Sequence, residues 1–321
     1  MFSQCLKAGR TLPTLIAAVI CSVGLCSSVL SQTSLTKASS RSLTIITEPS
    51  STIWLDGIQY GATDDSGRLV INWVPPGAHT LKIRARGFKQ LTKVVPATTK
   101  GETAAPLIKT SDPAEVAFQE AESLRSVDRG KAAEAFLSAI KLNPKNIDAF
   151  IGLARTYAEA GEYEKALTAI RNGRRLNPAS AELSVIEGRV QKDSGSEERA
   201  IAAFNRSLKE GRGFQPEAYT GLGLLYKDRA ETAGGSGDYD LENEDYTLAA
   251  KDLAAAAKQL GGSPDAMVVY QLLGLIYEKQ KKYSAAIGTY EEFLAIFPDT
   301  GEASAVRSFI DQIKKQMQSK N

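Results

Sequence analysis

Cysteine and histidine are almost absent from this chain. Its 321 residues include three cysteines, all at or before Cys26, and one histidine, His79. Protein zinc sites draw their four ligands mostly from these two residue types, and the cysteines lie in a segment that we expect to be removed. A catalytic Ser-His-Asp set would have to be built on His79, and no nucleophile-elbow sequence accompanies it. We therefore predict no metal, no cofactor and no enzymatic activity.

An excess of either charge is also missing. Lys and Arg total 39, and Asp and Glu total 37, which gives a formal net charge of +2. Proteins whose main partner is nucleic acid usually carry a clear basic excess, so nucleic acid is not predicted as a partner. Aromatic residues make up only 7% of the chain. This composition favours an Ala-rich helical array over a large β-barrel.

The N-terminal segment, 1–31, has the pattern of a secretory signal peptide. Lys7 and Arg10 precede an apolar run over residues 12–30. A basic segment followed by an apolar one is typical of an export signal, and the small residues before Gln32 fit a cleavage site. We predict that residues 1–31 are removed and that the protein is exported, to the periplasm or the cell envelope.

Two other fates of this segment stay open. An uncleaved membrane anchor is one, although the apolar run contains several serines and a glycine and is weak for a spanning helix. Lipidation at Cys26 is the other, but Leu25 stands where a small residue would be needed. Contact with the membrane is predicted only through one of these two routes.

The sequence period changes to that of short strands after a Ser/Thr-rich linker, residues 32–41. From 42 to 109, alternating segments are separated by Gly and Pro turns. Asp56-Gly57 is a hairpin-turn signal, and Leu107-Ile108 is expected to form the last strand. Six or seven short strands in about 70 residues favour a small all-β sandwich.

This β segment resembles the PEGA domain. The residues that carry the resemblance are Glu48-Pro49, the run Trp54-Leu55-Asp56-Gly57, and Pro76-Gly77-Ala78-His79-Thr80-Leu81 followed by Arg86-Gly87-Phe88. The resemblance implies a bacterial extracytoplasmic accessory module with no catalytic residues. His79 is expected to be a surface or half-buried strand residue.

The stretch from 146 to 178 reads as two short amphipathic helices joined by a tight turn. The apolar residues of the first helix recur at helical spacing and therefore form one stripe along it: Phe150, Leu153, Ala154 and Tyr157. Gly161 breaks the first helix, and Pro178 stops the second. A hairpin this short cannot bury its own apolar face, so it requires a stacked neighbour.

The neighbours are visible as a repeating interval in the sequence. Leu-Asn-Pro ends at Pro144 and again at Pro178, and Pro264 and Pro298 are separated by the same interval. With its small and aromatic positions, this period of about 34 residues resembles the tetratricopeptide (TPR) repeat. The resemblance implies an all-α superhelical solenoid of about five helix pairs over residues 113–298, closed by a capping helix within 299–321.

Three units depart from the pattern. The first matches it poorly in its first helix, as a capping unit does. The third has Gln191 where the first helix of its neighbours has an aromatic residue. The fourth carries an insertion, residues 228–245, with a glycine-rich start and an acidic end. An EF-hand calcium loop would need a turn glycine and a final Glu that are not at the required spacing. We expect a solvated, flexible loop there.

The inner surface of the array is the predicted binding site. In stacked helix pairs the first helix of each pair lines the concave side. Its residues outside the apolar stripe are the candidate groove: Ile151, Arg155, Val185, Arg189, Lys192, Thr220, Leu224, Lys227, Gln271 and Glu278. Four of them are basic, which favours an extended peptide with acidic groups. An ordinary solvated face is the alternative.

We therefore predict an exported, non-enzymatic scaffold or adaptor that holds a protein or peptide segment in this groove at the bacterial cell envelope. A second hypothesis is a cell-wall or glycan-associated protein, with the β domain as the binding module and the repeats as a spacer. Exposed aromatic residues would favour it, and the candidates are Trp54, Tyr60 and Trp73.

Overall fold

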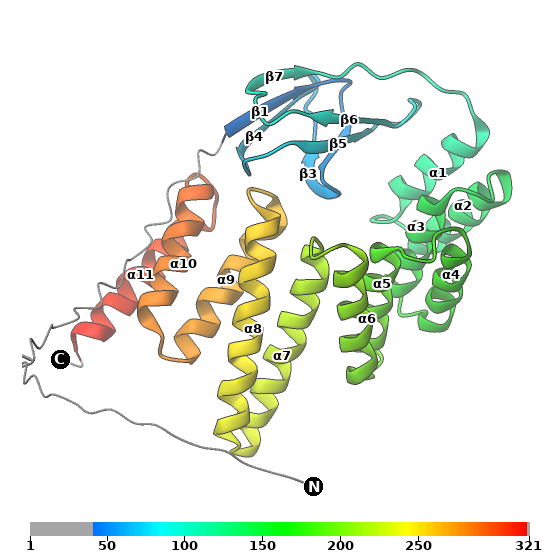
Figure 1. Cartoon of the computed structure of the whole chain (residues 1–321). Coiled ribbons are helices and arrows are strands. Elements are labelled where there is room, and N and C mark those ends of the chain that lie inside the picture. The colour runs from blue at the N-terminus through cyan, green and yellow to red at the C-terminus, as the bar shows by residue number, and fades with distance from the viewer. Residues whose placement is uncertain (1–40, 320–321) are drawn as a thin grey trace, which may run out of the picture. The chain divides into compact units, whose positions relative to one another are not determined.

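The computed structural model describes residues 41–319. The predicted export signal, residues 1–31, lies outside the described residues, as does the linker up to residue 40. Within the described part, seven strands are followed by eleven helices (Figure 1). The predicted fold class, a small two-sheet β region followed by a helical repeat array, is confirmed.

The β region consists of two sheets. A three-stranded sheet has the order β4-β1-β7, formed by β1 (Arg41–Ile46), β4 (Arg68–Val74) and β7 (Gly101–Ala104). A four-stranded sheet has the order β3-β2-β5-β6, formed by β2 (Thr52–Leu55), β3 (Ile58–Ala62), β5 (His79–Arg84) and β6 (Leu91–Val95). All neighbours are antiparallel except β1 and β7, which run parallel.

Alternation along the strands gives the β region its core. Leu43 and Ile45 of β1 are fully buried, as are Ile53 of β2 and Leu81 of β5, so both sheets contribute one apolar face. The predicted turn at Asp56 is present, because Asp56 and the glycine after it have φ angles of 51° and 83° and join β2 to β3. Two positive φ angles in a row are those of the tight type I′ hairpin turn.

The last strand differs from the expectation. It is β7, at Gly101–Ala104, and the expected strand Leu107-Ile108 is wrong, since Ile108 is 71% exposed. After β7, the Ala105 amide donates to the Ile46 carbonyl at 2.8 Å. Pro106 follows and has no amide hydrogen to continue the ladder, so the chain leaves the sheet there.

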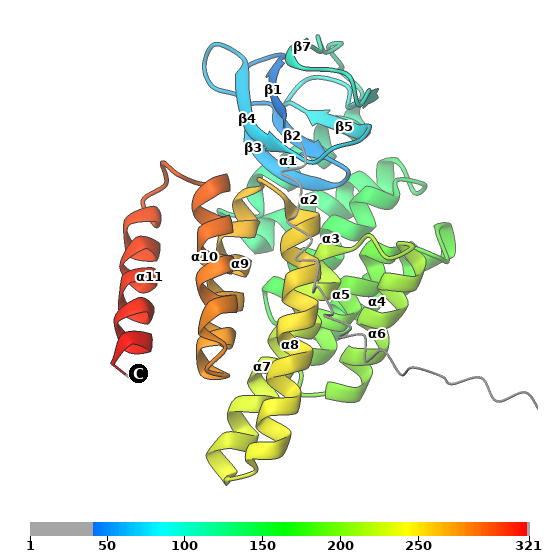
Figure 2. The same cartoon turned by 60° about the vertical axis from the view of Figure 1, so that its left-hand side comes forward.

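The helical part contains eleven helices in the described residues. In chain order they are α1 (Pro113–Leu124), α2 (Arg129–Leu142), α3 (Ile147–Glu159), α4 (Tyr163–Leu176), α5 (Ala181–Asp193), α6 (Glu197–Glu210), α7 (Pro216–Ser236), α8 (Tyr239–Leu260), α9 (Pro264–Lys279), α10 (Tyr283–Ile296) and α11 (Ala303–Gln318). The first ten form five antiparallel hairpins, and each hairpin packs on the next (Figures 1 and 2).

Glycines on the first helices let aromatic rings of neighbouring helices pack closely. A Cβ atom added at Gly152 would lie 2.4 Å from the Phe136 ring. The Phe204 ring is held in the same way on two sides, since added Cβ atoms at Gly188 and Gly221 would lie 2.5 and 2.4 Å from it. Because Gly188 is in α5 and Gly221 is in α7, one ring joins the third hairpin to the fourth.

The insertion lengthens two helices and does not form a loop. Residues 228–236 continue α7, and α8 begins at Tyr239, so the expected flexible loop is wrong. Only the turn between them is non-helical: Gly237 has a φ of 85°, and the Asp238 side chain caps α8. Asp245 is fully buried and accepts a hydrogen bond from Arg229 Nε at 2.6 Å.

The C-terminal helix α11 packs on α10 through one apolar face. Val306, Ile310 and Ile313 are buried, as the helical spacing predicts. Phe309, which the same spacing predicts to face inward, is instead 42% exposed and contacts the Tyr290 ring at a centroid distance of 5.8 Å. It therefore lies at the edge of the packed face.

Candidate protein-binding surface

The first helices of the later hairpins present equivalent faces. The apolar stripe of each of these helices contains one small residue, alanine or glycine. The residue directly after it occupies the equivalent position in every one of these hairpins: Arg155 in α3, Arg189 in α5, Leu224 in α7 and Leu275 in α9. Helix α3 packs on α5, and α5 packs on α7. The first three of these residues therefore lie along one continuous surface, which we call the inner face.

The structure separates the ten predicted groove residues into two groups. Ile151 and Val185 are 8% and 0% exposed and belong to the packed core between the helices. The other eight are partly exposed: Arg155, Arg189, Lys192, Thr220, Leu224, Lys227, Gln271 and Glu278. These eight are available to a partner, subject to the contacts that they already make within the chain.

Arginines and glutamates pair across the inner face. Arg155 donates from both terminal nitrogens to Glu217, at 2.9 and 2.7 Å, and one of these nitrogens also lies 3.4 Å from Glu182. Arg189 donates to the same Glu217 at 3.2 Å. Glu182 and Glu217 are in the first turns of α5 and α7, where the helix dipole favours a negative charge. The network joins α3, α5 and α7.

This pairing controls the ionisation of Glu217. Burial alone would raise the pKa of its carboxyl, but Arg155 and Arg189 outweigh that effect and lower the pKa to about 2. Burial also opposes the charge on Arg155, and Glu217 more than compensates, so the pKa of Arg155 is raised. Both groups are therefore charged at neutral pH.

Glu217→Gln is expected to destabilise the array in a pH-dependent way. The Glu217 pKa falls from an ordinary 4.5 to about 2 on folding. The ionised carboxylate therefore stabilises the fold above about pH 4.5, and this contribution is lost as the pH falls towards 2. We expect the variant to lose about 2 kcal/mol of unfolding free energy at pH 7 and to approach the wild type near pH 2, as measured by urea titrations at several pH values.

Glu231→Gln is the matched control for this experiment. Glu231 is also in α7 and pairs with Lys227 at 2.8 Å, but its side chain is 48% exposed. Exposed ion pairs contribute little, so this variant is expected to change the stability by less than about 0.5 kcal/mol at any pH. Equal effects of the two substitutions would contradict the role assigned to Glu217.

The basic residues of the predicted groove are all engaged by carboxylates of the chain. Besides Arg155 and Arg189, Lys192 lies 3.3 Å from Asp193, and Lys227 pairs with glutamate on its own helix. Their positive charge is therefore largely neutralised before any partner arrives. An acidic peptide would therefore have to compete with carboxylates of the chain for these residues.

An apolar patch on α9 was missed in the sequence. Val268 and Leu275 are 61% and 42% exposed and lie one turn before and one turn after Gln271. They occupy the places that Asp148 and Arg155 occupy in α3. The sequence did contain a signal for Leu275, because Leu275 directly follows Gly274 in the same way that Arg155 directly follows Ala154. We call Val268 and Leu275 the α9 patch.

Comparison with known proteins identifies the repeats. Family models described as tetratricopeptide repeat match residues 128–184 and residues 235–299. The helical array is built of tetratricopeptide repeats. Both matched segments lie in the helical part, so the resemblance of the β region to the PEGA domain stays a prediction.

Several solved structures resemble the chain at low identity. Yeast Tom70 is 17% identical with a TM-score of 0.51, over 65% of this chain and 41% of that chain. The MamA protein is 20% identical with a TM-score of 0.42, over 61% of this chain and 96% of that chain. YrrB, described as a TPR protein with an unusual peptide-binding site, is 18% identical with a TM-score of 0.37, over 62% and 94%. No curated protein matches the chain. At this identity the likeness to Tom70 shows the fold alone.

The β region is fastened to the first TPR hairpins by Arg84. Its side chain is 9% exposed, donates to Glu122 of α1 at 2.9 Å and pairs with Asp148 of α3. The guanidinium also lies over the Phe118 ring of α1, 4.7 Å from the ring centre, and 5.5 Å from the centre of the Trp54 ring. One buried side chain therefore joins β5 to two helices.

A second contact joins the β region to the α8–α9 turn. The Tyr60 hydroxyl donates to the Leu260 carbonyl at 3.4 Å. Trp73 of β4 covers Gly261, where an added Cβ atom would lie 2.6 Å from the indole ring. Tyr60 and Trp73 are thus engaged in this contact, whereas Trp54 is partly exposed and lies beside the cations of Lys82 and Arg84. The glycan hypothesis stays a hypothesis.

The histidine has a structural environment. His79 is 7% exposed, so it is more buried than the sequence indicated. Its Nδ1 lies 2.6 Å from the Asp56 carboxylate and its Nε2 lies 2.9 Å from the Pro75 carbonyl. Asp56 also accepts from the Thr80 amide at 2.7 Å. These contacts hold two neighbouring turns of the β region together.

Residues 41–319 lack the features of two other functional classes. No group of three or more His, Cys, Asp or Glu side chains in this part of the chain is arranged to hold a metal ion. No helix in the same part is both long and apolar enough to cross a membrane.

Proposed function

We propose that the protein is a non-enzymatic scaffold that binds a segment of a protein partner on the TPR array. The observation that carries the proposal is the array itself, with first helices whose faces stay partly open to solvent beside exposed apolar residues of α9. TPR repeats suggest protein–protein interaction, because stacked hairpins offer a long surface without enclosing a reaction site.

The chemistry of the surface favours an apolar contact on the partner. The charged residues of α3, α5 and α7 already form ion pairs with one another. A charged partner would have to break these pairs, and the free energy lost would be about as large as the free energy gained. The α9 patch has no such internal partner, and burying it removes apolar surface from water. Leu224 of α7 is also apolar and partly exposed, and it occupies the position in its helix that Leu275 occupies in α9. We propose that the partner segment places apolar side chains against the α9 patch.

We also propose that the protein acts at the bacterial cell envelope after export. The basic and apolar character of residues 1–31 supports export, and the resemblance of residues 42–109 to the PEGA domain supports an extracytoplasmic location. The β region would then act as an accessory module attached to the binding array. These two supports come from the sequence.

The test is a pull-down from bacterial envelope extract with the full chain and with the double variant Val268→Glu/Leu275→Glu. Two carboxylates in the patch would have to be desolvated on binding, so recovery of partners is expected to fall at least about tenfold. Mass spectrometry of the N-terminus of protein purified from the same cells should place it at Gln32. An unprocessed N-terminus would contradict a cleaved export signal.

Leu137→Glu is the matched control. Leu137 is 49% exposed and lies on α2, the second helix of its hairpin, away from the inner face. This variant should recover the same partners as the wild type. If all three proteins recover the same partners in equal amounts, the α9 patch is not the binding surface.

A further inference from the structure

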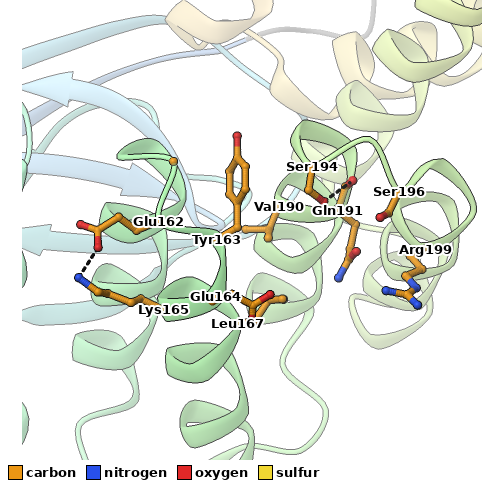
Figure 3. A pocket seen from close by; sticks show the side chains of 11 residues that line it. Glu162, Tyr163, Glu164, Lys165, Leu167, Val190, Gln191, Ser194, Ser196 and Arg199 are labelled. Atoms are coloured by element: carbon orange, nitrogen blue, oxygen red, sulfur yellow. Dashed lines mark hydrogen bonds and ion pairs between the residues drawn. The ribbon is translucent and has the colours of Figure 1, made fainter.

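A wide, solvent-open cavity of about 610 Å³ lies on the surface between the second and third TPR hairpins. One side is formed by the turn before α4 and the first turn of that helix, and the other by the end of α5 and the start of α6 (Figure 3). Leu167 and the Tyr163 ring supply apolar surface on the side of the second hairpin, and Val190, Gln191 and Arg199 lie on the side of the third (Figure 3). The volume is within the range of pockets that hold a small ligand or a large side chain.

The repeat explains why the cavity exists. Gln191 follows Tyr157 by one repeat period, so it stands at the position where the second hairpin has an aromatic ring. Tyr157 packs against the hydrophobic core, and Lys165 Nζ lies 5.4 Å from the centre of its ring. Arg199 follows Lys165 by the same period. The third hairpin therefore keeps the cation and lacks the ring beneath it.

The two residues at this place are not engaged elsewhere among the described residues. The Gln191 amide makes no side-chain hydrogen bond, and the Arg199 guanidinium, which is exposed, makes no hydrogen bond or ion pair with residues 41–319. Val190 beside them is 1% exposed and forms an apolar floor. A flat ring with one polar edge matches this combination of an apolar floor, an amide and a free cation.

We propose that this cavity receives an aromatic side chain, tryptophan or tyrosine, from a protein partner. The incoming ring would take the place that Tyr157 fills in the second hairpin, with Arg199 over its face as Lys165 lies over Tyr157. The cavity is at the turns of the hairpins, so it is a contact separate from the α9 patch and does not depend on it.

An anionic ligand fits the cavity less well. Glu162 and Glu164 lie on the side opposite Arg199 (Figure 3). Glu162 is paired with Lys165, and Glu164 is exposed, so the carboxylates balance the cations around the opening. A neutral aromatic group gains from Arg199 without opposing these carboxylates.

The test uses N-acetyl-tryptophanamide as a neutral aromatic probe and saturation-transfer NMR on the full chain. Wild type should bind it with a Kd of about 1 mM or tighter. Gln191→Tyr supplies the missing ring from the chain itself, so probe affinity should fall at least about tenfold while Tm rises by about 2 °C. Arg199→Gln should weaken binding about threefold without a change in Tm.

Arg175→Gln is the control, since Arg175 is an exposed arginine at the end of α4 that is remote from the cavity lining. It should leave probe affinity unchanged. The proposal is overturned if wild type does not bind the probe at about 10 mM. It is equally overturned if Gln191→Tyr binds the probe as wild type does or lowers Tm, because the ring would then not occupy the cavity.

Discussion

Replacing Arg84 by alanine is expected to lower the free energy of unfolding by about 3 kcal/mol. The substitution removes a cation that is only 9% exposed. It leaves the Glu122 and Asp148 carboxylates, which are 30% and 37% exposed, without their common partner, and breaking such a pair on one side is costly. It also removes the cation from the Phe118 ring. Chemical denaturation of wild type and variant measures the loss.

Hydrogen exchange can show where the loss occurs. The Gly87 amide donates to the Gln119 side chain of α1 at 2.8 Å, and that side chain donates to the Phe88 carbonyl at 2.7 Å. If Arg84 holds the β region against α1, protection of the Gly87 amide should fall by more than protection of the β1 amides, which lie inside the three-stranded sheet. Equal losses throughout the chain would mean that Arg84 supports the fold without anchoring this contact.

Arg86→Ala is the matched control. Arg86 lies two residues after Arg84 and also pairs with α1, donating to Glu120 at 2.8 Å, but its side chain is 78% exposed. Ion pairs of this kind contribute between about 0 and 1 kcal/mol. A control variant as destabilised as Arg84→Ala would contradict the claim that burial gives Arg84 its effect.

The two contacts of the β region constrain the TPR array. Arg84 attaches the region to α1 and α3, and Tyr60 and Trp73 attach it to the turn between α8 and α9. Isolated solenoids are held together only by contacts between neighbouring repeats. Here a β region outside the repeat series contacts both the first hairpins and the last ones.

The regular part of the fold could be predicted from the sequence because its signals are local and repeated. Gly161 and Pro178 mark the ends of α3 and α4, and the apolar stripe with Tyr157 identifies the packed face. Gln191 could be recognised as an exception in the sequence because the neighbouring repeats have an aromatic residue at the same position. What the departure does, which is to open a cavity, needed the positions of both hairpins.

The insertion shows where local reasoning failed. A stretch rich in glycine and acidic residues was expected to be solvated, yet Asp245 is fully buried against Arg229. These two residues are distant in the sequence and meet because α7 and α8 extend together past a short turn. Gly237 and Asp238 signalled that turn, as a left-handed glycine and a helix cap do. The buried partner could not be identified without the hairpin.

The inner face shows the same limit for function. The sequence correctly indicated that Arg155 and Arg189 are not part of the apolar stripe, but it could not show that both meet Glu217 of another hairpin. Residues far apart in the chain had to be brought together before their charges could be compared. Whether the predicted groove binds a partner stays a prediction. The α9 patch, which our proposal favours, was not among the ten predicted residues and was found only in the structure.

Phe204→Ala is expected to destabilise the array by about 3–5 kcal/mol, the range for removing a fully buried phenylalanine ring. The ring lies between Gly188 of α5 and Gly221 of α7, so the loss falls on the junction between the third and fourth hairpins. We expect denaturation to become less cooperative, because repeats are coupled through such junctions. Leu137→Ala, at an exposed site on α2, should cost under about 1 kcal/mol.

A double-mutant cycle with Gly221→Ala separates the ring from its surroundings. In the wild type the added methyl group would lie 2.4 Å from the Phe204 ring, so this substitution alone should be destabilising. In the Phe204→Ala background the same methyl group enters space that the ring has vacated, and its cost should disappear or reverse sign. The two changes should therefore be non-additive by about 1–3 kcal/mol. Strict additivity in urea titrations would mean that the ring does not hold the two hairpins together through Gly221.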